Sequence, residues 1–488
     1  MSQVAPQPSF LATRRGKVTL AFLCGVAFLD FVDASIVNVA LPSIRHSLHF
    51  SVQSLQWVLS GYLLTYGGFM LLGGRAADVV GRRRMLVAGT IVFTASSLTA
   101  GLAGSEGMLV GARLVQGIGA AMMIPAALSI LTTSFSEGAE RAQAIGAWGA
   151  TGGIASALGV FLGGVLAGGP GWRWVFFVNL PICAIDLIAV FRLIPSDRRA
   201  ASSRNFDFLG ALLITTGMLV LIYTLVKAPQ IGWGDARTIG GLGVAAGLLA
   251  AFAANESRHS SPLFPFSILR IKGLAAADLT QVVALAGTYS MFFFVTLYMQ
   301  DVLGFSKVDA GLAYVPTTLG VAVSAGICSR LIPRIGTRPL IVGGALVDAA
   351  GIYWLSRIPV DGSYVSDLLP GLVIMSLGFG AIFVAVTTAA QAGVPPDKAG
   401  LAAGLINAST WVGGALGLAI FSAISTSRAQ NLLAAGAPLD HALTAGFGRA
   451  LLACSLFLVG AALIALRATN AGQATADLGE VADAAATL

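Results

Sequence analysis

Long apolar runs are the feature that most constrains how this chain can fold. A helix needs about 20 mostly apolar residues to cross the hydrocarbon of a bilayer. Lipid offers a backbone no hydrogen-bond partners, so runs of this length can satisfy their peptide groups only as helices. We predict fourteen spans, at 18–42, 54–74, 85–104, 107–132, 143–167, 174–195, 207–227, 237–255, 273–299, 309–331, 338–357, 365–389, 400–427 and 446–467.

The composition excludes an ordinary soluble protein. Only 10% of the residues are charged and 56% are hydrophobic, whereas soluble domains average about 25% charged residues. A net charge of +7 would suit nucleic acid only if the basic side chains gathered on one face. They lie instead in short segments between the apolar runs, so we expect a lipid bilayer as the partner and no nucleic acid.

The distribution of Lys and Arg predicts the orientation. Most of the 29 basic residues lie in segments on the same side as the two termini, and basic loops tend to stay in the cytoplasm. We therefore expect a multi-pass protein of the cell membrane (inner or plasma) with both termini cytoplasmic. Residues 1–17 form one tail, and the Ala-rich residues 471–488 form a second, disordered one. No feature of the sequence specifies an oligomeric state.

Ionisable side chains inside the apolar runs are the strongest candidates for function. A charge at the bilayer centre costs about 2.5–3.5 kcal/mol on insertion scales, so such residues are functional candidates by default. Asp30 and Asp33 lie three residues apart in the first run, and Arg113 lies deep in the fourth. No acid lies close to Arg113 in its own run, so we expect Asp33 to pair with it. This pair can couple transport to protons; a purely structural ion pair is the alternative.

Other side chains are candidates for contact with the transported molecule. Two carboxyl groups beside one guanidinium leave a negative balance, which favours a cationic or neutral amphiphile over an anion. The candidates for contact with a substrate or cation are Asp30, Asn38, Gln116 and Trp411. Three further acids lie in apolar runs without a motif around them, and their role stays open: Asp186, Asp278 and Asp348.

Cysteine and histidine usage argues against a metal site and against an enzyme. The four Cys and four His show neither CxxC spacing nor a His pair. We expect no metal, no cofactor and no catalytic residues. An intramembrane enzyme would need a nucleophile beside a base, and it is therefore a remote alternative.

A compact basic turn joins the second and third runs. It reads Gly74-Arg-Ala-Ala-Asp78-Val-Val-Gly81-Arg82, followed by two more arginines. Glycines permit a tight turn and close backbone approach, and Asp78 can pair with Arg82 or interact with a helix N-terminus. We predict that Gly74, Asp78, Gly81 and Arg82 stabilise one conformational state rather than touch the substrate. Anchoring of the topology is the alternative role for the arginines.

These motifs resemble those of the major facilitator superfamily, and in particular its fourteen-span drug:proton antiporters of the EmrB/QacA type. Asp33–Pro42, Gly74–Arg84 and Arg113–Gly119 are similar to the first-span motif, the loop motif and the fourth-span arginine motif. Two further segments resemble those of this subgroup: Trp172–Ile182 and Ala399–Asn407. The resemblance covers nearly the whole chain.

The resemblance implies a fold and a function. The expected fold is all-α, with six-helix bundles at 18–200 and 261–470, two inserted spans at 201–260, and substrate between the bundles. The expected function is proton-coupled efflux of lipophilic small molecules, either drugs or a secreted metabolite. Val160 replaces the proline of the family's antiporter motif, so a proton-coupled importer of a small metabolite stays open as the alternative. Trp411 stands in a place where a polar residue is frequent.

Overall fold

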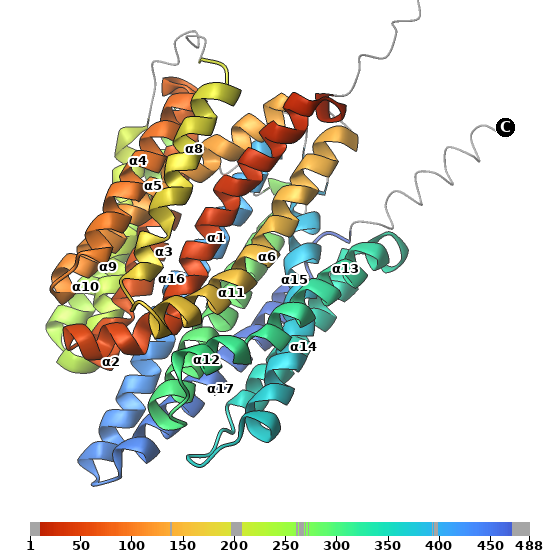
Figure 1. Ribbon diagram of the computed structural model, residues 1–488. Helices are drawn as coiled ribbons and strands as arrows, with labels where there is room; N and C mark the ends of the chain where they lie inside the picture. Colours follow the sequence, from red (N-terminus) through yellow and green to blue (C-terminus); the bar gives the residue numbers. More distant parts are fainter. Residues whose placement is uncertain are drawn as a thin grey trace, which may run out of the picture.

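The computed structural model describes residues 10–136, 139–196, 207–259, 262, 268, 270–271, 273–392, 394 and 399–470. Every regular element in these residues is a helix. Figure 1 shows that the first long helix begins, and the last one ends, at the same end of the molecule. We call this the terminal end and the opposite one the far end. The predicted tail at 471–488 lies outside the described residues, and the tail at 1–17 is described from Phe10 onward.

Long helices follow one another along the chain, with a few short helical segments between them. In chain order the elements are η1 (Phe10–Ala12), α1 (Arg14–Leu48), α2 (Val52–Leu55), α3 (Trp57–Val80), α4 (Arg82–Gly101), α5 (Glu106–Ser134), α6 (Ala139–Gly168), α7 (Trp174–Phe177), α8 (Asn179–Leu193), α9 (Phe208–Ile231), α10 (Ala236–Arg258), α11 (Leu274–Leu297), η3 (Tyr298–Val302), α12 (Lys307–Ala313), α13 (Val315–Ile335), α14 (Thr337–Leu355), η4 (Tyr364–Leu368), α15 (Leu369–Gln391), α16 (Ala399–Ala434) and α17 (Leu439–Ala465).

Each predicted apolar range overlaps one of these helices or a consecutive pair of them. Within the described residues, 11 helices are long and apolar enough to cross a membrane, judged by length and composition. The structure therefore supports a multi-pass membrane protein, and the count of fourteen spans stays a prediction.

Short polar side chains begin several of the helices. Thr13 accepts a hydrogen bond from the backbone N–H of Gly16 at 3.0 Å and so caps α1. Ser105 caps α5 and Ser306 caps α12 in the same way. Such caps satisfy N–H groups that have no partner within the helix. They place the helix starts where polar segments meet the apolar runs.

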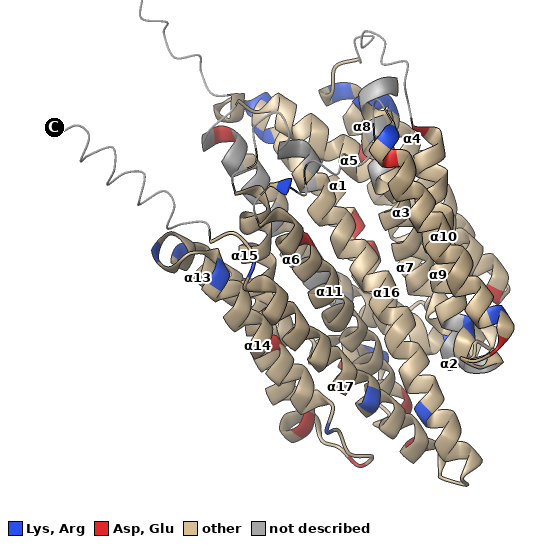
Figure 2. Ribbon diagram, turned by 180° about the vertical axis from the view of Figure 1, so that it is seen from behind, with Lys and Arg blue, Asp and Glu red and all other residues tan. Residues whose placement is uncertain are grey.

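The outer surface suits lipid rather than water. Figure 2 shows the charged residues concentrated toward the two ends of the helices. Between those ends, large apolar side chains stay exposed, for example Ile185 at 65%, Leu319 at 61% and Leu456 at 62%. Exposed apolar surface of this extent marks contact with another apolar phase, which here is the bilayer.

The long helices pack as two groups (Figure 1). In the first bundle α1 packs against α6, and α5 packs against both α3 and α4. In the second bundle α15 packs against α13 and α14, and α11 packs against α16 and α17. Helices α9 and α10 pair with each other, and α9 also contacts α3 and α16. The two helices between the bundles in sequence therefore lie beside them rather than inside either one.

Polar contacts join the two bundles at the far end. Arg45 at the end of α1 lies 2.5 Å from the Asp301 carboxylate of η3. The Gln300 amide donates to the Val39 carbonyl oxygen at 2.9 Å, and the Lys307 ammonium donates to the Ala167 carbonyl oxygen at 3.0 Å. The structure is therefore held closed at the far end.

Candidate functional site

Asp33 and Arg113 meet inside the first bundle. Arg113 Nη1 lies 2.7 Å from Asp33 Oδ2, and both side chains are fully buried. Arg113 Nε also donates to the Val58 carbonyl oxygen at 2.9 Å, and Nη1 donates to Gln116 Oε1 at 2.7 Å. The guanidinium therefore joins α1, α3 and α5. Gly117 permits this approach, because a Cβ there would lie 2.4 Å from the Tyr62 carbonyl oxygen.

Two amides complete the surroundings of Asp33. Its Oδ1 accepts from Gln116 Nε2 at 2.8 Å and from Asn179 Nδ2 at 2.6 Å. Both amides also donate to Ser97 Oγ, at 2.7 and 3.0 Å. The carboxylate thus receives three donors from α5 and α8, one of them cationic, and hydrogen bonds with an ionised partner are stronger than neutral ones. Protonation of Asp33 would weaken all of them together.

Asp30 occupies a separate site in the same bundle. It is 1% exposed, and its oxygens accept from Tyr62 and Tyr66 of α3, each at 2.8 Å. The Tyr62 ring lies under the Arg113 guanidinium, with 4.1 Å from Cζ to the ring centroid. Such a cation–π contact is favourable when it is desolvated. Tyr62 therefore touches both ionisable sites.

An aromatic cluster covers Asp30 at the interface between the bundles. The Tyr66 ring stacks on Trp411 of α16 with centroids 4.6 Å apart. Phe31 of α1 and Tyr289 of α11 lie with their rings 6.1 Å from that of Trp411. The rings of this cluster belong to helices of both bundles, so a relative movement of the bundles must change the contacts between them.

The substrate candidates divide into two sets. Asp30 and Gln116 are buried among side chains of the first bundle, so in this conformation neither faces a space between the bundles. Trp411 lies at the interface, and the half-buried Asn38 donates only to its own helix, at the Ala34 carbonyl oxygen. Contact of any of the four with substrate stays a prediction.

Glycine at position 81 has a clear structural reason. Its φ of 114° links α3 to α4, in a region that side chains other than glycine rarely enter. The next residue, Arg82, donates to the Thr133 hydroxyl of α5 at 2.7 Å, and Gly74 faces Pro125 of α5. The Asp78 side chain lies outside the described part of the structure. The gating role of this turn stays a prediction.

The glycines around Val160 bring α6 against α1. A Cβ at Gly159 would lie 2.9 Å from the Val32 carbonyl oxygen, and one at Gly163 would lie 2.4 Å from the Ile36 carbonyl oxygen. Glycines of this kind permit helices to pack closely in lipid. The Val160 side chain itself lies outside the described part of the structure.

The three remaining acids lie apart from the Asp33 cluster. Asp348 is fully buried in α14 and accepts from the Thr288 hydroxyl at 2.9 Å. Asp278 accepts weakly from Ser409 at 3.4 Å, and Asp186 Oδ2 has no hydrogen-bond partner among the described residues. In that same part of the chain, no group of three potential metal ligands is present.

Asn179 and Ser97 were missed by the sequence analysis. Asn179 lies within Trp172–Ile182, the segment that resembles the antiporter subgroup, and it is a polar residue in an otherwise apolar stretch. That combination is the signal that would have singled it out. Ser97 carries no comparable signal, because single serines are common in membrane helices.

Comparison with known proteins adds independent findings. The family profile described as Major Facilitator Superfamily matches residues 23–418. The chain is 38% identical over 418 residues to the puromycin resistance protein pur8 of Streptomyces alboniger, and the alignment covers 85% of this chain and 83% of that protein. It is 36% identical over 457 residues to the cephamycin export protein CmcT of Amycolatopsis lactamdurans, covering 93% and 92%. The chain shares its fold with a solved structure of a bacterial homologue of the human lysosomal transporter Spinster, in an inward-facing and unoccupied conformation. The TM-score is 0.65 and the sequence identity is 18%, and the match covers 93% of this chain and 97% of that one.

Proposed function

This chain belongs to the major facilitator superfamily, and we propose that it is a proton-coupled exporter of lipophilic small molecules. The observation that carries the proposal is the fully buried Asp33–Arg113 pair. Ionisable groups inside a membrane protein mark proton and substrate pathways. Relatives named for puromycin resistance and cephamycin export support an antimicrobial drug or a secreted metabolite as the cargo.

The proposed topology has fourteen spans, as in antiporters of the EmrB/QacA type. Both ends of the described chain lie at the terminal end (Figure 1), which requires an even number of crossings. Helices α9 and α10 lie beside the two bundles, as two inserted spans would. The bias of Lys and Arg toward the terminal side supports a cytoplasmic location for that side. The far end, where the bundles are joined, then faces outward.

A chain of contacts connects the proton site to the bundle interface. Protonation of Asp33 would remove the negative charge that holds Arg113. The guanidinium lies on the Tyr62 ring, Tyr62 donates to Asp30, and Asp30 accepts from Tyr66. The same Tyr66 ring stacks on the second bundle through Trp411. A proton on Asp33 can in this way bias the equilibrium between two bundle arrangements.

Growth of sensitive cells tests the function. Cells without their own efflux pumps would express the wild type or Asp33→Asn and be exposed to a panel of lipophilic antimicrobial compounds. Export predicts that the wild type raises the inhibitory concentration of some compounds and lowers their accumulation, and that the variant does neither. An importer would instead make cells more sensitive. An enzyme would change the compound chemically, which mass spectrometry of the medium would reveal.

Substrate charge gives a separate prediction. The buried Asp30 carboxyl and the aromatic rings over it suit a cationic or neutral amphiphile, because cations interact favourably with ring faces. We expect Asp30→Asn to weaken resistance to cationic compounds about tenfold, which corresponds to roughly 1.4 kcal/mol, because the cation loses a negative charge to pair with; the effect on matched neutral compounds should be smaller. Inhibitory concentrations across matched cationic, neutral and anionic compounds measure this. Preferential export of anions that does not respond to Asp30→Asn would contradict it.

The turn at Gly81 gives a prediction about gating. Alanine at a φ of 114° would add strain of about 1–3 kcal/mol, so we expect Gly81→Ala to lower the turnover rate more than substrate affinity. Asp78→Asn should act in the same direction. Gly104→Ala is the matched control, because a Cβ there meets nothing within 4 Å. Normal turnover with greatly weakened binding in Gly81→Ala would exclude a gating role.

A further inference from the structure

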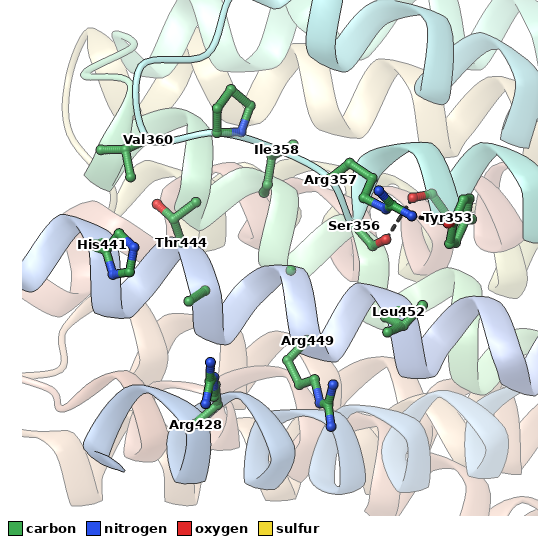
Figure 3. A pocket seen from close by; sticks show the side chains of 13 residues that line it. Tyr353, Ser356, Arg357, Ile358, Val360, Arg428, His441, Thr444, Arg449 and Leu452 are labelled. Carbon is green, nitrogen blue, oxygen red and sulfur yellow. Dashed lines mark hydrogen bonds between the residues drawn. The ribbon is translucent and has the colours of Figure 1, made fainter. Parts of the chain in front are cut away.

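A pocket of about 680 Å³ opens at the far end of the second bundle. Figure 3 shows it between the segment that follows α14, the end of α16 and the start of α17. Four basic side chains line it: Arg357, Arg428, His441 and Arg449. The pocket lies away from the Asp33 cluster, which is in the other bundle.

The described side chains that line the pocket carry no negative charge, and its four basic residues are exposed. Arg428 and Arg449 form no hydrogen bond or ion pair with described residues, and Arg357 donates only to the neutral Tyr353 hydroxyl. Arginine stays protonated in proteins, so three like charges share one pocket. Arg428 and Arg449 lie on the same side of α17, whereas Arg357 turns toward Tyr353 (Figure 3), so an anion bound between Arg428 and Arg449 would relieve the repulsion of those two.

Topology does not account for these arginines. The far end carries the minority of the basic residues, and there Arg45 is paired with Asp301 while Lys307 donates to a backbone carbonyl. A signal for orientation would place basic residues on the opposite side. The arginines of the pocket therefore need another reason.

Two polar features of α17 complete a site for oxygen atoms. The Thr444 side chain is 5% exposed, lines the pocket, and its hydroxyl has no hydrogen-bond partner among the described residues. Helix α17 begins at Leu439 without a side-chain cap, its first turn holds Asp440 and His441, and of these two His441 lines the pocket. Uncapped N–H groups at a helix start favour anions.

An apolar track leads from the pocket along the same helix. Leu452 lines the pocket. Leu456 and Leu463 follow on the same helix and are 62% and 64% exposed. A molecule with an anionic head and an acyl tail could therefore occupy both regions.

We propose that this pocket binds a phosphate-bearing anion, with Arg428 and Arg449 as its principal ligands. Arginine suits phosphate because its planar group donates two parallel hydrogen bonds. The phosphate can belong to the headgroup of an anionic phospholipid or to a soluble compound. The proposal does not depend on the transport mechanism.

Lipid binding by the purified full chain tests the proposal. Delipidated protein in neutral detergent would be titrated with phosphatidylglycerol, with phosphatidylcholine and with inorganic phosphate, and followed by native mass spectrometry and thermal unfolding. We expect phosphatidylglycerol to bind about tenfold more tightly than phosphatidylcholine, because the arginines attract the net negative charge that only the phosphatidylglycerol headgroup carries. The double substitution Arg428→Gln and Arg449→Gln should remove this preference. The corresponding double lysine variant should keep most of it, and Arg237→Gln, a control away from the pocket, should not change it.

The outcomes separate the two sources of phosphate. A preference for phosphatidylglycerol that the glutamine variant loses supports a lipid headgroup. Stabilisation by inorganic phosphate that only the glutamine variant loses, without any lipid preference, supports a soluble anion. If neither probe distinguishes the wild type from the glutamine variant, the proposal is overturned. Should the double variant fail to fold, each single glutamine variant is measured in the same way.

Discussion

Arg113→Ala is expected to abolish transport and to lower the free energy of unfolding by about 3–5 kcal/mol, which is typical when one partner of a buried ion pair is removed. The fully buried Asp33 carboxylate would lose its cation. The Val58 carbonyl and the Gln116 amide would each lose a donor as well. Thermal unfolding of the purified protein in detergent measures the first effect, and substrate efflux measures the second.

A double variant separates the effect of the unpaired buried charge from the effect of the lost side-chain volume. Arg113→Ala combined with Asp33→Asn removes both charges, so we expect it to recover much of the lost stability and none of the transport. Arg237→Ala serves as a control for loss of an exposed arginine. An Arg113→Ala protein that unfolds at the wild-type temperature would show that the buried pair does not stabilise the first bundle.

Asp33→Asn is expected to reduce gradient-driven transport to the level of vesicles without protein. The amide has nearly the size of the carboxyl group and keeps an acceptor oxygen for Arg113, so the variant should insert and fold, with a loss of stability because the buried guanidinium has no counter-charge. It cannot bind and release a proton, so an imposed pH gradient should no longer move substrate. Exchange of labelled for unlabelled substrate needs no net proton movement, and it should persist.

A second buried acid supplies the control for Asp33→Asn. Asp348 is equally buried but lies in the second bundle and accepts only from Thr288 among the described residues. Asp348→Asn should therefore keep gradient-driven transport. Undiminished gradient-driven transport by Asp33→Asn would end the proposed role of Asp33 in coupling.

The Asp33–Arg113 contact could be predicted from the sequence, because a permanent charge in lipid must find a counter-charge and α5 offers none near it. Two further members of the cluster, Asn179 beside Asp33 and Ser97 beside the two amides, could not. Asn179 and Ser97 are neutral. A neutral polar residue costs little free energy in a membrane helix, so its presence does not by itself indicate a site. Packing of α8 against α1 brings Asn179 to the carboxylate, and packing of α4 against α5 and α8 places Ser97 beside Gln116 and Asn179.

The sequence alone also could not predict that Asp30 and Asp33 have different hydrogen-bond partners. Their spacing of three residues places them on neighbouring faces of a helix, which suggested a shared site. In α1 those two faces meet different helices: Asp30 meets the tyrosines of α3, and Asp33 meets α5 and α8. The basic pocket had no sequence signal, because its arginines come from separate segments that only the fold brings together.

Transport by the purified protein in vesicles tests the central claim most directly. The protein is reconstituted, the vesicle lumen is made acidic, the membrane potential is held at zero, and a substrate found in the resistance assay is added outside. Antiport predicts that the substrate accumulates in the acidic lumen, that accumulation ends when the pH gradient is dissipated, and that Asp33→Asn shows none. Substrate that is driven out of the acidic lumen, or that moves equally well without a gradient, would contradict a proton-coupled exporter.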